Sequence, residues 1–361
     1  MKSVYIHIPF CSSICTYCDF SKIYYDEKIV GKYLNSLERE INNTYKHELI
    51  KTIYIGGGTP SSLNTLELER LFEILEIFDK REVEEYTIEC NIDDITEEKL
   101  MLFKNKGINR ISYGVQSFNK RILKTLGRKH TKEMVENVID MTKKAGITNI
   151  NIDLIYGVDG VTLEELKQDV DDFLKLDVPH ISLYSLIIEP HTKLYIDSFP
   201  TIDEDLNFLM YNYINNKLKE CGYKHYEISN YAKENSESKH NLVYWNNKEY
   251  YGFGVGASSY IDNVRYDNTR SITLYLKGNY ILNKNILTKR ETMENEMILG
   301  LRLTSGVDKD NFYKKFNIDV EDVFNIKDLL SKGLLTFKDN CYLIEEDKLF
   351  ISNSILIEFL E

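Results

Sequence analysis

Three cysteines near the start of the chain are spaced so that their thiolates can share one inorganic centre. Cys11, Cys15 and Cys18 follow the pattern C-x3-C-x2-C directly after the apolar run of residues 4–10, which predicts a strand that leads into a loop. A [4Fe-4S] cluster usually takes four thiolates, so three cysteines leave one iron open to a small ligand. The spacing therefore predicts a [4Fe-4S] cluster with a reactive iron.

Two other interpretations of these cysteines stay open. They could hold a zinc ion with His7 as a fourth ligand, or they could be reduced thiols without any metal. Closely spaced exposed thiols are prone to oxidation, and Pro9 restricts the backbone just before Cys11. Both considerations favour the cluster.

The elements that must position these cysteines are repeated β-α units. Short β-branched runs alternate with amphipathic segments up to about residue 190, which predicts an α/β fold with a parallel sheet. Six units rather than eight indicate a partial (β/α)6 barrel. Capping-box spacing marks helix starts at Asn64 and Thr162, and Thr201 with Glu204 marks another near the helix predicted over residues 203–220. The predicted strands are residues 4–10, 52–56, 85–90, 110–115, 149–154 and 180–186.

Unusual residues follow several of these strands at their carboxyl ends. They are Gly57, Gly58 and Thr59 after the second strand, Glu89 at the end of the third, Gln116 after the fourth and Asp153 in the fifth. In a barrel of parallel strands these ends converge on one mouth. Glycines allow a ligand to approach the backbone, and carboxylates there would suit a ribose diol or a cationic group. A tight turn and ordinary structural hydrogen bonds are the alternatives.

Further along the chain, tyrosine and glycine become frequent over residues 222–260. This stretch contains His240-Asn241-x-x-Tyr244-Trp245 and a glycine-rich piece at 250–257, which indicates a close approach of the backbone to something else. An imidazole beside flat rings suits an axial heme ligand, although a hydrogen-bonded packing histidine fits equally. A hairpin around residues 334–342 predicts a small α+β, winged-helix-like region. We expect a barrel over residues 1–220, a flanking segment over 221–289 and a C-terminal domain over 290–361.

Composition restricts the class of protein. The formal net charge of −12 argues against binding to a nucleic-acid backbone. We expect a cytoplasmic protein, because no long apolar run and no leader are visible. Cys90, Cys221 and Cys341 are scattered, which suits a reducing compartment and simple packing roles.

The cysteine stretch, with its flanking words Tyr5-Ile-His-Ile-Pro-Phe and Tyr17-Cys-Asp-Phe, resembles the radical S-adenosylmethionine (SAM) superfamily. The nearest branch contains oxygen-independent coproporphyrinogen III oxidases and HemW-like heme chaperones. The resemblance implies that the three cysteines bind a [4Fe-4S] cluster whose open iron takes SAM, with no catalytic residues beyond the cluster. The SAM contacts that it implies are Tyr5, Tyr17, Gly57, Gly58, Thr59, Glu89, Gln116, Arg128 and Asp153.

Phe20 and His240-Asn-x-x-Tyr-Trp245 favour the chaperone within that branch, because the oxidases carry a further cysteine where Phe20 stands. The resemblance implies that His240, Asn241, Tyr244 and Trp245 bind heme for delivery to a membrane haemoprotein. It also implies a flavodoxin- or ferredoxin-type electron donor and a peripheral location at the membrane.

The alternatives are coproporphyrinogen decarboxylation by a radical SAM enzyme and a zinc-holding interaction protein. Ile92 and Asp159 replace prolines that are usual in the branch, and Lys239 precedes His240 without the nearby cysteine of many relatives.

Overall fold

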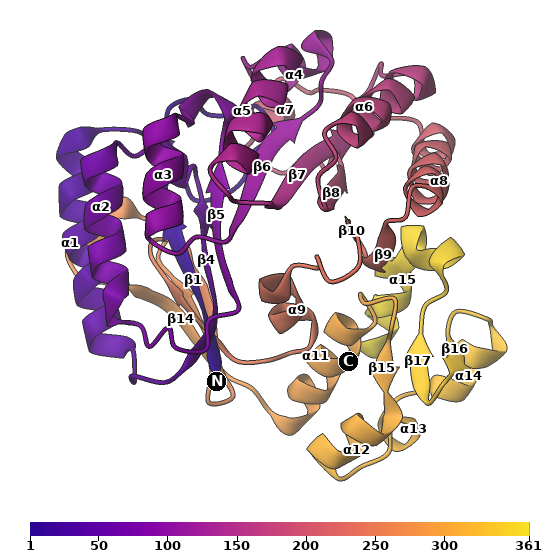
Figure 1. Cartoon of the computed structure of the whole chain (residues 1–361). Coiled ribbons are helices and arrows are strands. Elements are labelled where there is room, and N and C mark those ends of the chain that lie inside the picture. The colour runs from indigo at the N-terminus through magenta and orange to yellow at the C-terminus, as the bar shows by residue number, and fades with distance from the viewer. Residues whose placement is uncertain (361) are drawn as a thin grey trace.

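The computed structural model describes residues 1–360 and is organised around one twelve-stranded sheet. Its order is β14-β13-β12-β11-β1-β4-β5-β6-β7-β8-β10-β9. The six central strands are parallel neighbours in chain order, which confirms the predicted repeat of β-α units. The sheet curves without closing on itself (Figure 1). These six strands are β1 (Lys2–Ile8), β4 (Ile50–Gly57), β5 (Glu85–Cys90), β6 (Arg110–Gln116), β7 (Asn149–Tyr156) and β8 (His180–Ser185).

Helices connect the parallel strands and cover the convex side of the sheet (Figure 1). Capping boxes at Asn64 and Thr162 are present as predicted. The Thr201 prediction was wrong: Asp203 caps the next helix by accepting from the Leu206 amide at 3.0 Å, because Thr201 forms a β-bridge with Val158 and is held extended. The helices between these strands are α1 (Glu27–Thr44), α2 (Thr65–Ile74), α3 (Glu97–Asn105), α4 (Lys120–Leu126), α5 (Lys132–Lys144) and α6 (Leu163–Lys175). α7 (Lys193–Ile196) and α8 (Glu204–Glu220) follow the last parallel strand, β8.

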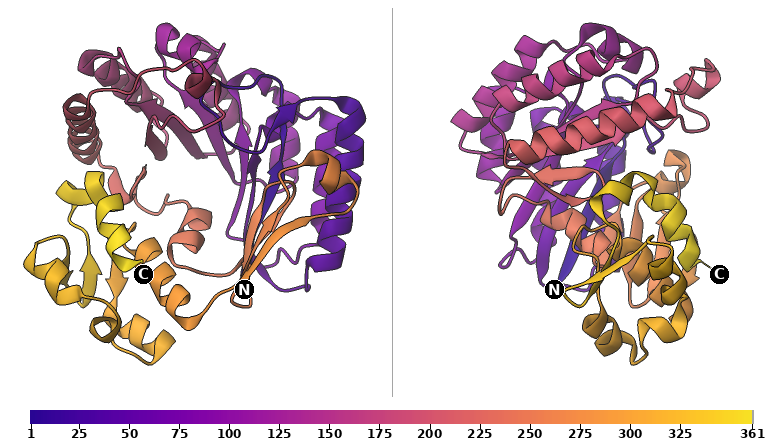
Figure 2. Two further views of the ribbon diagram at one scale, coloured as in Figure 1. Left: turned by 180° about the vertical axis from the view of Figure 1, so that it is seen from behind. Right: turned by 90° about the vertical axis from the view of Figure 1, so that its right-hand side faces the viewer.

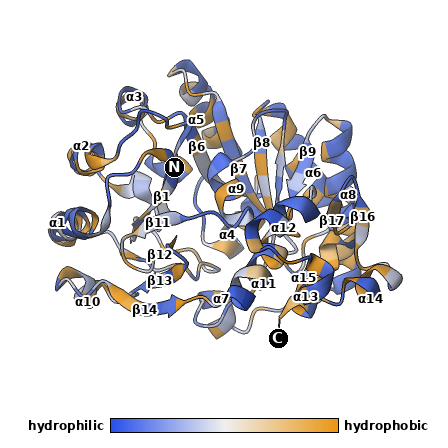
Figure 3. Ribbon diagram, turned by 90° about the horizontal axis from the view of Figure 1, so that it is seen from below, coloured by the Kyte–Doolittle hydropathy of each residue, from blue (hydrophilic) through white to orange (hydrophobic). Residues whose placement is uncertain are grey.

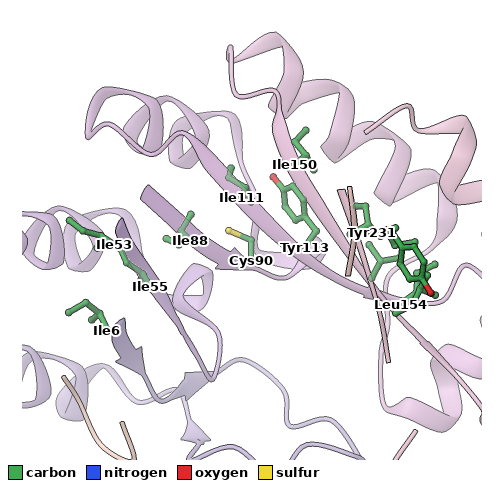
Figure 4. Packing of buried hydrophobic residues seen from close by; sticks show 14 of the residues in the cluster. Ile6, Ile53, Ile55, Ile88, Cys90, Ile111, Tyr113, Ile150, Leu154 and Tyr231 are labelled. Atoms are coloured by element: carbon green, nitrogen blue, oxygen red, sulfur yellow. The ribbon is translucent and has the colours of Figure 1, made fainter. Parts of the chain in front are cut away.

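Successive residues along the central strands face opposite sides of the sheet: one set packs in the hydrophobic core, and the other faces the interior of the barrel. Side chains such as Ile53, Ile88 and Ile111 are fully buried between sheet and helices (Figure 4). Their neighbours in sequence face the concave side and are polar, for example Tyr54 and Glu89. Because successive strand residues point to opposite faces, this pattern leaves a polar interior that needs a partner.

The segment after α8 extends both edges of the sheet, which the sequence analysis did not foresee. β11 (Tyr250–Phe253) runs parallel to β1, and the antiparallel strands β12 (Ser258–Ile261), β13 (Val264–Asn268) and β14 (Ile281–Ile286) follow it, with α10 (Ile272–Leu276) between the last two. At the other edge lie β10 (Asn230–Ala232) and β9 (Lys224–Glu227). The predicted close backbone approach is confirmed at Gly252, where a Cβ would lie 1.9 Å from the Ser258 carbonyl oxygen.

A short helix between these edges enters the barrel. α9 (Lys239–Trp245) lies between β1 and β8 when the molecule is seen from the front and from below (Figures 1 and 3). Glu85 on β5 holds its first turn, since its carboxylate accepts from the backbone N–H groups of Lys239 at 2.8 Å and His240 at 3.0 Å. An acidic group at a helix N-terminus is favourable, so this contact fastens α9 to the sheet.

The last part of the chain forms a small unit beside β9 and α8 (Figure 2). The hairpin predicted at residues 334–342 is confirmed as β16 (Thr336–Lys338) and β17 (Cys341–Leu343), and β15 (Val307–Asp308) pairs with β17. Phe350 packs on Phe208 of α8 at 5.3 Å between ring centroids. No helix within residues 1–360 is long and apolar enough to cross a membrane. The helices here are α11 (Lys289–Gly300), α12 (Lys309–Phe316), α13 (Val320–Val323), α14 (Ile326–Ser331) and α15 (Ser352–Leu356).

Candidate functional site

The concave side of the sheet holds a cavity of about 320 Å³. All of the residues predicted for the cluster and for SAM line it, except Tyr5. The hydroxyl of Tyr5 instead forms a hydrogen bond with Nδ1 of His7 at 3.0 Å. The predicted residues that line the cavity are Cys11, Cys15, Tyr17, Cys18, Gly57, Gly58, Thr59, Glu89, Gln116, Arg128 and Asp153.

The loop that carries the cysteines is fastened at several points. Cys11 lies in β2 (Phe10–Cys11), which pairs with β3 (Ile23–Tyr24). Thr16 ties the loop to α4, because its amide and hydroxyl donate to the carbonyls of Leu126 at 3.2 Å and Thr125 at 2.8 Å. The three sulfurs therefore face the cavity from a loop that is held in place.

The three thiols face the cavity without meeting at one point. Within residues 1–360, no group of three or more His, Cys, Asp or Glu side chains is close enough to hold a single metal ion. The thiolates of an iron–sulfur cluster each bind a different iron and stand further apart. Both ring nitrogens of His7 are engaged, Nδ1 by Tyr5 and Nε2 by the Ser21 carbonyl at 2.7 Å.

Burial makes the thiolate form unfavourable at Cys11 without a cation. Burial raises the pKa of Cys11 to about 11, and the Thr59 hydroxyl, which donates to its sulfur at 3.5 Å, opposes that rise. Burial also raises the pKa of the Cys18 thiol. Metal ions deprotonate the thiols that coordinate them. The donor set and its surroundings therefore fit an iron–sulfur cluster.

The glycine run after β4 has a structural reason as well as the predicted functional one. Gly57 has a φ of +116°, and a Cβ there would lie 2.6 Å from the His7 ring. A Cβ on Gly58 would lie 2.7 Å from the Pro9 carbonyl carbon. The run thus packs directly against the segment that leads into the cysteine loop, which brings Thr59 beside Cys11.

Glu89 and Asp153 face the cavity from neighbouring parts of the sheet. Tyr54 donates to one Glu89 oxygen at 2.7 Å, and the Gly57 amide donates to the other at 2.9 Å. Burial outweighs these bonds and raises the pKa of Glu89 to about 7. Asp153 accepts from Asn151 at 2.7 Å, and burial raises its pKa also. Each carboxylate retains capacity to accept hydrogen bonds from a ligand.

The cations of the cavity lack carboxylate partners among the described residues. Arg128 donates to the Asn91 side chain at 2.5 Å and to the Tyr17 hydroxyl at 3.4 Å, and its Nε has no partner. Gln116 adopts a left-handed φ of 69° beside it. A guanidinium without an ion pair is a ready receptor for a carboxylate. This geometry fits the amino-acid end of SAM.

Arg110 is a site residue that the sequence analysis missed. It is only 2% exposed, it lines the cavity, and its Nε lacks a hydrogen-bond partner. No ion pair involves it within residues 1–360, although its charge acts on Glu89 and Asp153. The sequence did contain a signal for this residue. Arg110 and Gln116 are an even number of positions apart on β6, so their side chains point to the same inner face of the sheet.

The four residues predicted to bind heme are not equivalent in the structure. Asn241 lines the cavity. His240 is 1% exposed, with Nδ1 hydrogen-bonded to the Thr52 hydroxyl and Nε2 to the Tyr244 hydroxyl, both at 2.7 Å. Trp245 lies under the Arg302 guanidinium at 5.4 Å, and its Nε1 is buried without a partner. The motif therefore forms the floor of the barrel, and the half-buried Asn241 is its residue that lines the cavity.

Comparisons with known proteins agree with this geometry. The model of the radical SAM superfamily matches residues 5–173, and that of the HemN C-terminal domain matches residues 287–346. The heme chaperone HemW of Lactococcus lactis is 43% identical, covering 99% of this chain and 97% of its own. HemW of Bacillus subtilis is 39% identical, covering 100% and 99%, and HemW of Escherichia coli is 31% identical, covering 99% and 98%.

A solved structure has the same fold. The coproporphyrinogen III oxidase HemN of Escherichia coli, described as a radical SAM enzyme, superposes with a TM-score of 0.87 at 23% identity. The match covers 99% of this chain and 89% of that chain. The predicted partial barrel with a smaller C-terminal part is therefore confirmed.

Proposed function

The chain belongs to the HemW family of heme chaperones within the radical SAM superfamily, and we propose that it binds heme and delivers it to membrane haemoproteins. We propose also that it holds a [4Fe-4S] cluster at Cys11, Cys15 and Cys18, and SAM beside that cluster. One observation carries this proposal: the cysteine loop, the glycine run and the strand-end residues line a single cavity.

Different residues of the cavity bind different parts of SAM. Arg128 receives the carboxylate of the methionine part, since its guanidinium has no carboxylate partner within residues 1–360. Glu89 and Asp153 accept hydrogen bonds from ribose hydroxyls or the amino group. Gly57 and Gly58 allow the ligand to approach the backbone. When bound, the cluster would supply an electron to the sulfonium of SAM. A flavodoxin- or ferredoxin-type partner provides that electron.

We place the protein in the cytoplasm, with peripheral attachment at the membrane where heme is handed over. The chain has a net charge of −12, so attachment to an anionic membrane surface is unfavourable over most of the molecule. Delivery is therefore expected to depend on a protein acceptor. Mixing heme-loaded protein with an apo-haemoprotein in nanodiscs, and following transfer of the Soret band, tests this step.

Phe20 separates the proposed function from coproporphyrinogen decarboxylation. Its side chain is 67% exposed and lines the cavity, so this position offers no thiol to the site. The direct test is an anaerobic titration of cluster-reconstituted protein with heme, paired with a decarboxylation assay on coproporphyrinogen III. Saturable heme binding without decarboxylation supports the chaperone. Rapid formation of protoporphyrinogen would instead establish the enzyme.

A further inference from the structure

The guanidinium of Arg110 is a buried cation that has no partner in the protein. Arg110 is 2% exposed, and within residues 1–360 no group forms a hydrogen bond or an ion pair with its side chain. A guanidinium carries five N–H donors, and a buried charge that is left unpaired destabilises the folded protein. The missing partner is therefore expected to be an anionic ligand.

Two carboxylates near Arg110 do not serve as its partners. The Arg110 charge opposes the rise that burial causes in the pKa values of Glu89 and Asp153, so the three groups are neighbours. Neither acid forms an ion pair with the guanidinium, and both oxygens of each acid already accept a hydrogen bond from another group. Burial favours the protonated form of both acids, which lowers the repulsion that an entering anion would meet.

The other arginine of the cavity lies nearer the cysteine loop. Arg128 sits against Gly114, where a Cβ would lie 2.7 Å from its Nη2, and it donates to the hydroxyl of Tyr17. Arg110 begins β6, so its side chain reaches the cavity from the end of the strand away from that loop. The proposed function assigns Arg128 to the carboxylate of SAM. Arg110 thus remains available for a second carboxylate.

The helix of the heme-associated motif borders the same part of the cavity. Asn241 of α9 and Arg110 both line it. The Arg110 charge also acts on the neighbouring His240: burial, and after it this charge, lower the pKa of His240 to about 3. The imidazole is therefore neutral, which is the form that binds a metal. The other polar side chains around Arg110 are uncharged donors and acceptors, namely Ser112, Asn151, Ser182 and Tyr184.

A propionate of heme has the chemistry that Arg110 lacks in the protein. A carboxylate accepts two parallel N–H bonds from a guanidinium, and such bonds are stronger where water is excluded. Heme carries its two propionates on one edge of the ring, so one of them can reach Arg110 while the ring lies toward α9. A ligand without a free carboxylate would leave the buried guanidinium unpaired, and the site would discriminate against it.

We propose that Arg110 is the receptor for one propionate of heme, which it binds inside the barrel beside α9. This inference rests on the proposed heme-binding function and names a residue that makes the site specific for a tetrapyrrole with a free carboxylate. It gives the two arginines of the cavity different ligands: Arg128 binds SAM, and Arg110 binds heme.

The test compares heme with its dimethyl ester, in which both propionates are uncharged. Both ligands are titrated anaerobically, in the same detergent and at the same pH, into protein that carries its cluster and no SAM, with the Soret band as readout. The variants are Arg110→Met and Arg110→Gln, which are neutral, and Arg110→Lys, which keeps the charge without the planar fork. Arg270→Met is the matched control, because the Arg270 side chain is 67% exposed and lines a separate cavity of about 280 Å³.

We expect the wild type to bind heme at least about tenfold more tightly than the ester, which corresponds to 1.4 kcal/mol. Arg110→Met and Arg110→Gln should bind the two ligands about equally, and Arg110→Lys should keep part of the preference. Arg270→Met should keep all of it. The iron and acid-labile sulfide content of each variant checks that it has folded around its cluster, and two neutral variants guard against the misfolding of one.

Three outcomes would overturn a part of this account. If the wild type binds heme saturably but does not prefer it to the ester, or if the neutral Arg110 variants keep the preference, the inference is wrong while the proposed function stands. A preference that is lost in Arg270→Met and kept in Arg110→Met would place the propionates outside the barrel. If the wild type binds neither ligand saturably, the proposed function fails, and this site falls with it.

Discussion

The imidazole of His240 stacks on the phenol ring of Tyr54 at 5.2 Å, and the Tyr54 hydroxyl donates to Glu89 at 2.7 Å. Tyr54 therefore links the motif helix α9 to Glu89 in the proposed SAM site, through one stacking contact and one hydrogen bond. A motif associated with heme and a carboxylate expected to bind SAM share one hydrogen-bonded and stacked unit on the inner face of β4 and β5. Changes on α9 should consequently be felt at Glu89.

Replacing His240 by alanine should destabilise the protein strongly. The substitution removes a buried ring, takes away the partner of the Tyr244 hydroxyl and leaves the Thr52 hydroxyl with only its bond to Ser3. We expect the free energy of unfolding to fall by about 3 kcal/mol, measured by urea denaturation of the apo-protein. His191→Asn serves as the control and should change it by less than about 0.5 kcal/mol. An unchanged urea midpoint in His240→Ala would contradict the structural role.

SAM affinity should increase with pH through the titration of Glu89. Burial raises the pKa of Glu89 to about 7, so the carboxylate is largely protonated at pH 6 and largely ionised at pH 8. The ionised form accepts hydrogen bonds from ribose hydroxyls, hence binding releases a proton below pH 7 and weakens as the pH falls. We expect about a tenfold loss of affinity from pH 8 to pH 6, measured by anaerobic calorimetry.

Glu89→Gln is the control for this pH profile. Glutamine keeps the shape of the side chain but does not titrate. The variant should bind SAM more weakly than the wild type, and its affinity should lack the pH dependence that Glu89 causes. The difference between the two profiles isolates the contribution of Glu89 from that of the ligand's own amino group. Parallel profiles for the wild type and the variant would remove Glu89 from the site.

Gly57→Ala should disturb both the fold and SAM binding. Its φ of +116° is strained for alanine, and the new Cβ would collide with the His7 ring. We expect a loss of about 2 kcal/mol or more in the free energy of unfolding. Gly31→Ala is the matched control, because Gly31 lies inside α1 with open space around its Cβ position. That variant should gain about 0.5–1 kcal/mol.

Cys15→Ala should lose nearly all bound iron and acid-labile sulfide after anaerobic reconstitution. Two thiolates are insufficient to hold a four-iron cluster. Cys90 also lines the cavity, but it is buried at the end of β5 and not part of the cysteine loop. Cys221→Ala controls for the loss of a thiol, since Cys221 is exposed at the end of α8. Equal iron content in both variants would show that the cluster site is misplaced.

Arg110→Met should weaken SAM binding and increase the free energy of unfolding. A buried guanidinium without an ion pair is costly, and replacing a buried charge by an apolar side chain of similar volume often stabilises. We expect about 1 kcal/mol more stability in the apo-protein. Burial raises the pKa values of Glu89 and Asp153 and the Arg110 charge opposes that rise. Without the Arg110 charge, the midpoint of the pH profile of SAM binding should move to higher pH. A variant that is less stable and binds SAM as the wild type does would contradict this.

The sequence determined those parts of the protein that depend on near neighbours along the chain. The six parallel strands follow from β-branched runs, and the helix starts at Asn64 and Thr162 follow from capping boxes, which join residues three positions apart. The cysteine spacing is also local, as is the glycine run that a positive φ at Gly57 requires. Even so, a local signal failed at Thr201, because its pairing with the distant Val158 competes with helix capping.

Tertiary structure decided what the inner face of the barrel does. β11 becomes a strand through pairing with the distant β1, where Val4 pairs with Tyr251. Short tyrosine- and glycine-rich segments carry little strand signal of their own. Whether an imidazole is free depends on partners such as Thr52 and Tyr54 that come from another element. His240 and His191 look alike in the sequence, but one is enclosed by hydrogen bonds and the other is exposed at a cavity mouth. Hydrogen bonding and burial are set by contacts that form only when the whole sheet has folded.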